Sequence, residues 1–546
     1  MRELTLFSQR PRSGGFALVL AIVTLAAVFL FGWKLGLKPL ENWDEGIHAE
    51  VSREMRASGD WLTLTYRDQL YTAKPPLKFW LTAPVIAVLG ETELAFRLWS
   101  ALAGVLTTLV LTVWAWQWMK SSWLALLTGL FFVSGRFTLF HVFRTGETDG
   151  LLLLFFVVSL YAYWKSWDDK RWWFLVGAAV GLAIMTKSLA GALPAIIMAI
   201  DITWRKGWST LDWKTIFKAV GLAAVIAVPW HLSQLFINGK SFWNGYFGFN
   251  VFERSSEVLY ANQVPWYWYA KVMAMRTFPW GPAVVAGGIL ALRRAWWQSS
   301  DLDRLLLIWI AVVWLLFTLV QTKFDWYILP LYPGLALLLA RGVEELFLKA
   351  RDRLVIGVYV LAVAATAFYL PDGLAREGIL WKMTPYAYLP EAASSVGGRV
   401  LVAIGVVLLI AALTIVVRKL TTVRPPSLLG ALGVGYVLVI ALGWYGSYLR
   451  HLPTASAFKT MAERVDRADA SELSVIGLNL ATQPAGYFYL RRIPDLKLRE
   501  VRTVDELSSG LVLTTTADDT STIRSQGRTI LQQGNFVLLD YIATKP

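Results

Sequence analysis

The sequence predicts a polytopic α-helical membrane protein of the kind that carries a small α/β domain at its carboxyl end, and three observations lead to this prediction. Of the 546 residues, 56% are hydrophobic and only 16% are charged, which is typical of chains with many membrane spans. Long apolar runs recur from residue 16 to residue 444, whereas residues 447–546 have an ordinary soluble composition. Although the net charge is +14, Lys and Arg occur in short loops between apolar runs, which indicates a positive-inside topology and no nucleic-acid partner.

The apolar runs divide residues 1–446 into about thirteen spans. We expect them at residues 16–37, 94–119, 123–141, 151–164, 172–186, 189–204, 216–237, 279–292, 305–320, 326–340, 354–370, 400–417 and 428–444. The basic loops then place the amino terminus in the cytoplasm and the soluble domain outside. Residues 74–90 hold too few apolar residues to cross, and counting them as a span would put the basic loops outside. We therefore expect a re-entrant or interfacial helix there, within a first outer loop of residues 38–93.

The remaining segments are assigned by their patterns. Residues 238–278 are expected to form a long aromatic outer loop. In the soluble domain, residues 454–468 have helical apolar spacing, and four short runs read as strands between turn residues. These runs are SELSVIGLNL, GYFYLRR, SGLVLTTT and NFVLLDYI. The small-residue pattern GAAVG at Gly177–Gly181, like the spacing of Gly430, Gly433 and Gly435, predicts close helix packing.

Charged side chains from at least five loops fall on the outer side of this topology. The set comprises Asp44, Glu45, Lys74, Arg144, Glu147, Asp149, Lys187, Arg254 and Lys323 with Tyr327. Cations stabilise the charge that develops on a phosphate leaving group, and a carboxylate can take a proton from a nucleophile. The combination therefore suits group transfer from a phosphate-linked donor.

Structural roles remain open for these residues. Asp44 and Glu45 are also what the first turn of a surface helix favours, and Lys74 could be a snorkelling interfacial lysine. Arg144 with Glu147 fits a structural ion pair, and the Trp and Tyr residues of 243–280 fit an interfacial belt. Lys187 and Lys323 end spans on the side where the charge rule disfavours cations, which favours a function for them.

An ordered series of motifs carries a family resemblance. The series is WDEGIHAEVSREM, KPPLKFW, FRLWSALAG, RTGETDG, TKSLAGALP, Pro229-Trp230, FNVFER, VPWYWY and KFDWYILPLYPGLALL. The resemblance that it carries covers Phe16 to about Arg341 and extends loosely to the tail. The series resembles the bacterial GT-C glycosyltransferases, in the group of the lipid A aminoarabinose transferases and the protein O-mannosyltransferases. This resemblance implies transfer of a sugar from a polyprenyl-phosphate donor to a lipid, glycan or protein acceptor on the extracytoplasmic face.

The resemblance also implies roles for individual residues. Asp44 matches the proposed catalytic base or acceptor-orienting acid, with Glu45 beside it, and Asp149 matches a second acid of the family. The positions that hold the donor phosphate are matched by Lys74, Arg254 and Tyr327, with Lys187 and Lys323 nearby. Ile47 and Ala73 depart from the aminoarabinose transferases, which usually have Arg and often Glu there. Ala73 removes a potential metal ligand.

We therefore expect no required cofactor and no metal site, although a divalent metal is not excluded. The chain has no cysteine, which excludes disulfides and Cys-ligated metals. Its four histidines are scattered along the sequence, which argues against a His-ligated metal cluster. Two alternatives of other classes stay open. A membrane phosphotransferase that modifies lipid A or surface glycan would need a metal cluster and a Ser or Thr nucleophile in the soluble domain. A lipid-linked sugar transporter would show internal repeats and mid-membrane charges.

Overall fold

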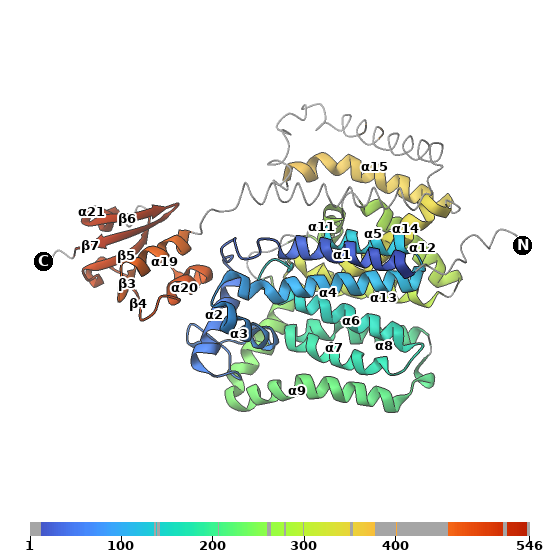
Figure 1. Ribbon diagram of the computed structural model, residues 1–546, viewed down its shortest axis with the longest axis horizontal. Coiled ribbons are helices and arrows are strands. Elements are labelled where there is room, and N and C mark those ends of the chain that lie inside the picture. The colour runs from blue at the N-terminus through green and yellow to red at the C-terminus, as the bar shows by residue number, and fades with distance from the viewer. Residues whose placement is uncertain are drawn as a thin grey trace, which may run out of the picture.

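The computed structural model describes residues 13–135, 138, 142–205, 207–258, 264–277, 280–298, 300–349, 353–376, 400, 404, 457–516 and 521–542. These residues form a bundle of helices that lie side by side, and a small sheet domain at one end of the bundle (Figure 1). The bundle helices are α1 (Ser13–Gly32), α4 (Glu93–Met119), α5 (Ser122–Val133), α6 (Asp149–Ser166), α7 (Trp172–Lys187), α8 (Leu193–Trp204), α9 (Trp213–Trp243), α12 (Gly281–Trp297), α13 (Asp301–Leu319), α14 (Tyr332–Val343) and α15 (Arg353–Arg376).

Within the described residues, seven helical stretches are long and apolar enough to cross a membrane. One of them, Trp172–Trp204, is divided by a short 3₁₀ turn at Ser188–Ala192 into α7 and α8, as the hydropathy pattern predicts. The spans expected at 400–417 and 428–444 lie outside the described residues apart from positions 400 and 404. The polytopic fold is therefore confirmed, and the total of about thirteen spans stays a prediction.

Two shorter helices lie at the end of the bundle that faces the sheet domain (Figure 1). They are α2 (Asp44–Ser58) and α3 (Leu77–Leu89), joined by a hairpin of β1 (Thr65–Tyr66) and β2 (Gln69–Leu70). The 13 residues of α3 extend for about 20 Å at the helical rise of ~1.5 Å per residue, well short of a ~30 Å hydrocarbon core. Within the described residues, α3 is thus not one of the helices long enough to cross, which agrees with the expectation of a re-entrant or interfacial helix.

The expectation of a long loop over 238–278 is wrong for most of its described residues. Helix α9 continues past a kink at Gly239 (φ 50°) to Trp243, and a π-helical segment follows over Asn244–Glu253. Helices α10 (Arg254–Ser256) and α11 (Trp268–Arg276) come next. The aromatic composition suggested a belt, but a backbone near the membrane is most stable when helical hydrogen bonds satisfy its polar groups.

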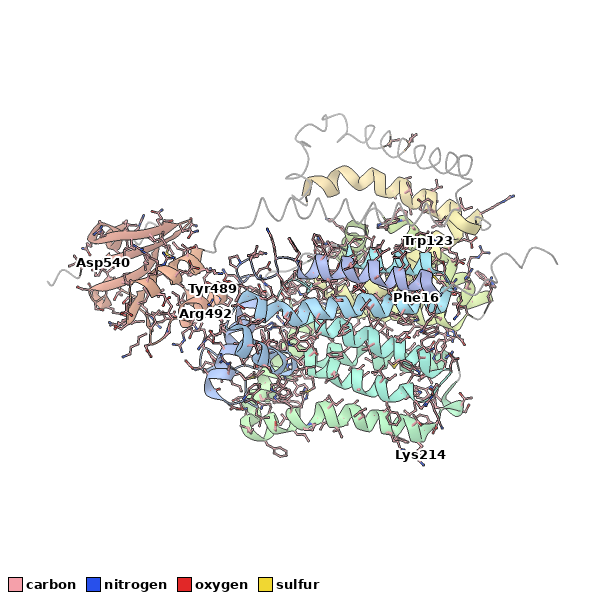
Figure 2. All side chains as sticks on the ribbon, viewed as in Figure 1. Phe16, Trp123, Lys214, Tyr489, Arg492 and Asp540 are labelled. Atoms are coloured by element: carbon pink, nitrogen blue, oxygen red, sulfur yellow. The ribbon has the colours of Figure 1, made fainter. Side chains whose placement is uncertain are left out.

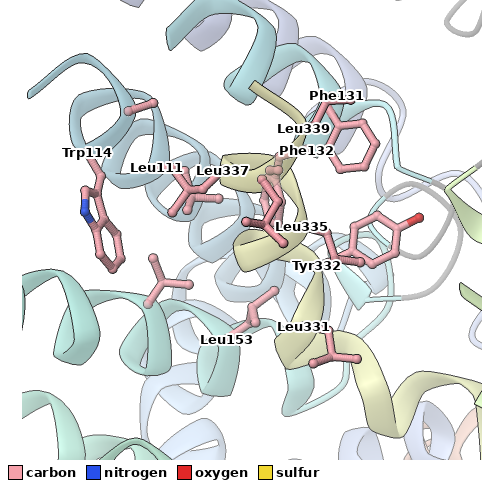
Figure 3. Close-up of a cluster of buried hydrophobic side chains, with 14 of the residues drawn as sticks. Leu111, Trp114, Phe131, Phe132, Leu153, Leu331, Tyr332, Leu335, Leu337 and Leu339 are labelled. Atoms are coloured by element: carbon pink, nitrogen blue, oxygen red, sulfur yellow. The ribbon is translucent and has the colours of Figure 1, made fainter. Parts of the chain in front are cut away.

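Large buried side chains fill the interior of the bundle, and Figure 3 shows a part of it where labelled side chains of α4, α5, α6 and α14 come together. Close helix packing also follows from glycine, as the GAAVG pattern predicts. A Cβ at Gly177 of α7 would lie 2.2 Å from the carbonyl oxygen of Ala219 in α9, so the two backbones touch. The Gly430, Gly433 and Gly435 pattern lies outside the described residues.

The carboxyl-terminal domain is a five-stranded mixed sheet of order β4-β3-β5-β7-β6 with three helices. Its elements are α19 (Ala457–Arg467), β3 (Glu472–Val475), α20 (Pro484–Arg491), β4 (Lys497–Glu500), β5 (Gly510–Thr515), α21 (Ser521–Gln526), β6 (Gly527–Gln533) and β7 (Phe536–Tyr541). The predicted helix and three of the four predicted strands are confirmed. GYFYLRR is wrong as a strand because it forms α20, with Pro484 in its first turn. A short apolar run that is buried on both sides cannot be distinguished as strand or helix by periodicity.

The contact of α12 with α14 gives a test of this packing. A Cβ at Gly287 would lie 1.9 Å from the carbonyl oxygen of Leu338, whereas one at Gly288 would lie 3.9 Å from the Cδ1 of Leu338, an ordinary contact. We expect Gly287→Ala to lower the free energy of unfolding by about 1–3 kcal/mol or more through overpacking. Gly288→Ala should be neutral or slightly stabilising, since Ala favours helix by ~1 kcal/mol. Thermal unfolding in detergent checks this, and equal midpoints for the two variants would contradict the packing.

Candidate active site

Arg97, in the first turns of α4, organises the segment that leaves α1. It is 1% exposed. Its guanidinium donates hydrogen bonds of 2.6–3.0 Å to three backbone carbonyls, those of Leu35, Lys38 and Pro39. It also forms a two-pronged pair with Glu45, with Nε 2.7 Å from Oε1 and Nη2 2.8 Å from Oε2. One planar side chain thus fixes both the exit of α1 and the start of α2.

Glu45 is the counterpart of this anchor. Besides its two bonds from Arg97, its Oε1 accepts from the backbone N–H of Gly146 and its Oε2 from that of Glu41, each at 2.7 Å. Burial alone raises the pKa of Glu45, but Arg97 and these donors outweigh it and hold the pKa below its usual value. With two donors on each oxygen, Glu45 has no position left for a substrate proton. The geometry therefore favours a structural role for Glu45, and its assignment as a catalytic residue stays a prediction.

Asp44, one residue earlier, faces a different environment. It begins α2 after Trp43, whose φ of 127° is uncommon for a residue with a side chain. Its Oδ2 lies 3.9 Å from the Nζ of Lys74, which is 6% exposed and precedes Pro75 and Pro76. Asp44 and Lys74 therefore come from opposite ends of the first outer loop and meet as an ion pair.

A second ion pair lies beside the first. Asp149 is the first residue of α6 and Lys187 the last of α7, and their Oδ1 and Nζ are 2.7 Å apart. The Nζ of Lys187 is also 6.0 Å from the ring centre of Tyr327, in the 3₁₀ turn Asp325–Leu331 that leads into α14. Three distant stretches of the chain thus meet at this pair.

The electrostatic couplings show that the two pairs share one site. Burial alone raises the pKa of Asp44, but Lys74, Lys187 and Arg254 together hold it below its usual value. For Lys74, burial is the largest effect and lowers the pKa, Lys187 and Arg254 lower it further, and Asp44 and Asp149 oppose the shift. Three cations and two carboxylates leave one positive charge in excess in this cluster. Such a cluster favours an anion such as a phosphate.

A cavity of about 310 Å³ opens beside Asp44. Four carboxylate side chains and three aromatic ones line it, namely Glu41, Asp44, Glu45, Glu147, Trp43, Phe324 and Trp326. The rings of Phe324 and Trp326 are stacked at 4.8 Å. Aromatic faces pack against the apolar faces of sugars and isoprenoids, while carboxylates accept hydrogen bonds from hydroxyl groups.

Lys323, also predicted for the phosphate site, has a backbone partner on its own segment. Its Nζ donates to the carbonyl of Val320 at 2.6 Å, and the pKa of Lys323 is lowered by burial. The cluster therefore comprises Asp44, Lys74, Asp149, Lys187, Arg254 and Tyr327. The geometry gives no support to Lys323 as a phosphate ligand.

Sequence reasoning missed Arg97 and His48. His48 is buried with its Nδ1 3.2 Å from the carbonyl oxygen of Gly146, so this nitrogen carries the proton. Burial lowers the pKa of His48 to about 3, which keeps the ring neutral. His48 could have been found because it lies four residues after Asp44, on the same face of a helix. For Arg97 the signal was an arginine inside an otherwise apolar run.

Comparisons with known proteins agree with this architecture. A model of the dolichyl-phosphate-mannose-protein mannosyltransferase family matches residues 73–232. The chain is 28% identical over 349 residues, 62% of each chain, to the undecaprenyl phosphate-alpha-4-amino-4-deoxy-L-arabinose arabinosyl transferase of Shewanella sediminis. It is 27% identical over 369 residues, 64% of this chain and 65% of the other, to that of Erwinia tasmaniensis.

The structural comparison shows the class of fold. ArnT from Cupriavidus metallidurans, solved bound to undecaprenyl phosphate, superposes with a TM-score of 0.70 over 96% of this chain and 98% of its own, at 20% identity. The chain therefore has the polytopic helical fold of the GT-C type. The sequence alignments span just under two thirds of the length of the two arabinosyl transferases, so activity and substrates are proposed below.

Breaking the Arg97 anchor should be costly. Arg97→Lys keeps the charge but has three donors for the five acceptor contacts. At least two buried acceptors then lose their partner, so the free energy of unfolding should fall by about 2 kcal/mol or more. Arg171→Lys is the matched control, because its pair with Asp169 is exposed and its loss should leave the unfolding midpoint unchanged. Thermal unfolding of both variants checks this, and an equally small effect in each would show that Arg97 is not an anchor.

Proposed function

We propose that the protein is an integral-membrane glycosyltransferase that moves a sugar from a polyprenyl-phosphate donor to an acceptor hydroxyl or phosphate. The observation that carries this proposal is the cluster of Lys74, Lys187 and Arg254 beside Asp44, next to a cavity lined by aromatic rings and carboxylates. A protein crystallised with undecaprenyl phosphate has the same fold. An arabinosyl transferase that is named for such a donor is 28% identical to this chain over 349 residues.

In the proposed reaction, the acceptor oxygen attacks the anomeric carbon of the donor sugar. The bond from that carbon to the phosphate oxygen breaks, and its electron pair stays on the phosphate. Lys74, Arg254 and the hydroxyl of Tyr327 stabilise the charge, and Asp149 holds Lys187 beside them. For a hydroxyl acceptor, Asp44 orients the group and takes its proton. A single displacement inverts the anomeric carbon, by analogy with inverting hydrolases.

The ion pair of Asp44 with Lys74 couples donor binding to catalysis. In the free protein, Lys74 is the strongest of the charges that lower the pKa of Asp44. A bound donor phosphate competes for the same ammonium group and adds a negative charge nearby. The pKa of Asp44 then rises, and the carboxylate becomes a stronger base when the donor is present.

The rest of the proposal concerns location and partners. We place the amino terminus in the cytoplasm of a bacterial inner membrane, because the basic loops then face inward. The site and the sheet domain share the opposite end of the bundle, which supports the proposal that transfer occurs on the extracytoplasmic face (Figure 1). The acceptor is a lipid, a glycan or a protein. We propose that the reaction needs no metal. An assay of sugar transfer in the presence of a chelator tests this.

The residue assignment is tested with Asp44→Asn and Lys74→Ala in purified protein and a radiolabelled polyprenyl-phosphate sugar. We expect each variant to lose on the order of 10²-fold or more in turnover, since each removes one catalytic interaction. Asp169→Asn and Lys170→Ala, in an exposed loop, are the matched controls and should transfer normally. If both site variants keep near-wild-type transfer while folded, the site assignment is wrong.

The pH dependence has a defined sign. The pKa of Asp44 in the free protein lies below the ordinary aspartate value of about 3.9, so the base is ionised at any higher pH. The decrease of kcat/KM on the acid side reports the pKa of Asp44 in the free enzyme, and its midpoint should lie below about pH 4. The decrease of kcat reports the pKa of Asp44 in the donor complex, and its midpoint should lie at a higher pH. Initial rates against pH measure both limbs. A kcat limb at or below the kcat/KM limb would contradict the coupling through Lys74.

A further inference from the structure

The sheet domain docks directly on the helix that carries Asp44. In Figure 1, α20 lies against α2, and Figure 2 shows Tyr489 of α20 where the domain meets the bundle. The contact is a backbone contact at Gly46, two residues after Asp44. A Cβ at Gly46 would lie 2.4 Å from the amide nitrogen of Ala485 and 2.9 Å from the carbonyl carbon of Pro484. No side chain larger than hydrogen fits there without moving a backbone.

Hydrogen bonds hold the chain on the other side of Asp44. The hydroxyl of Tyr489 accepts from the backbone N–H of Leu40 at 2.8 Å and donates to Glu93 at 2.9 Å. The Oδ1 of Asn42 accepts from the N–H of Ala485 at 3.2 Å. The domain therefore contacts residues 40–42 and Gly46, which flank Asp44 on both sides.

The apolar part of the contact is continuous with the core of the domain. Leu40, Ala49 and Phe96 belong to one buried cluster with residues of α19, α20 and three strands of the sheet. The rings of Phe96 and Phe488 meet edge to face at 5.2 Å. Phe96 precedes Arg97, so the anchor of α2 and the docking surface share one turn of α4. Opening this contact would expose a hydrophobic core and buried hydrogen bonds to water.

We propose that the sheet domain is a fixed part of the active site, and that Gly46 and Tyr489 are positioning residues that set the carboxylate of Asp44 against Lys74. This proposal rests on the proposed glycosyltransferase function and adds a role for the domain. The domain stays docked through the reaction, and it acts on catalysis through the backbone of residues 40–46.

Gly46→Ala tests the positioning role in the full-length protein. Helix propensity alone favours alanine inside a helix, so an undocked α2 would tolerate or prefer this change. In the docked structure the methyl group forces α2 and α20 apart. We expect kcat to fall about 10-fold to 100-fold, because small displacements of a catalytic group have effects of this size. KM for the donor should stay close to that of the wild type, since Lys74 and Arg254 are retained.

The matched control is Gly221→Ala in α9, where a Cβ would meet no atom within 4 Å. It should leave kcat and KM unchanged. A wild-type kcat in Gly46→Ala would overturn the positioning role, as would a proportional loss of kcat and of folded protein. A wild-type protein that transfers no sugar would instead reject the proposed function, and the two failures are therefore distinguishable.

A cross-link separates a fixed domain from a moving lid. The chain has no cysteine, and the side chains of Asn42 and Gln483 are hydrogen-bonded across the contact. Asn42→Cys with Gln483→Cys, joined by a short bifunctional methanethiosulfonate, should keep transfer at the level of the uncoupled double variant. Loss of transfer on coupling, reversed by dithiothreitol, would show that the domain must open and would overturn the proposal.

Discussion

The buried pair of Arg97 and Glu45 is the interaction on which the outer end of the molecule depends. Taking both charges out of water is costly, and the cost is offset only because each has its hydrogen-bonding groups met inside the fold. That requirement brings together the exit of α1, the start of α2, the first turn of α4 and the turn at Gly146 before α6. Asp44 and Asp149 each lie within three residues of this framework, so the framework decides where both side chains point.

The chemistry of the site follows from charges that no single segment supplies. Lys74, Lys187 and Arg254 come from the first outer loop, the end of α7 and the segment after α9. Water would screen such cations from each other, but at a buried site they interact strongly and favour an anion. These charges outweigh the effect of burial on Asp44 and hold its pKa below the usual value. The sheet domain adds a mechanical constraint to the same residue through Gly46.

Two wrong expectations share one physical cause. GYFYLRR was predicted as a strand and residues 238–278 as a loop, and both are largely helical where described. Each segment is rich in aromatic side chains, and contacts with distant parts of the chain decide which of them are buried. The alternation of apolar and polar residues within the segment is therefore a weak signal of its secondary structure. Helix α20 is buried because α2 covers one side of it and the sheet the other. The buried contacts of Glu45 could not be predicted for a similar reason, because its partners Arg97 and Gly146 are about 50 and 100 residues away.

The sequence by itself determined the membrane class, the order of the helices from residue 94 to residue 343, the short helix α3 and most strands of the sheet domain, whereas the expected span 123–141 is helical in α5 only to Val133. These features depend on local hydropathy, chain length and turn residues, which each segment carries on its own. It also named six residues that the fold brings together. Only the tertiary structure decided that Glu45 pairs with Arg97, that Lys323 donates to the carbonyl of Val320 and that the sheet domain docks on α2. The first and the last of these outcomes depend on which groups meet across long sequence separations, and one sequence does not specify such contacts.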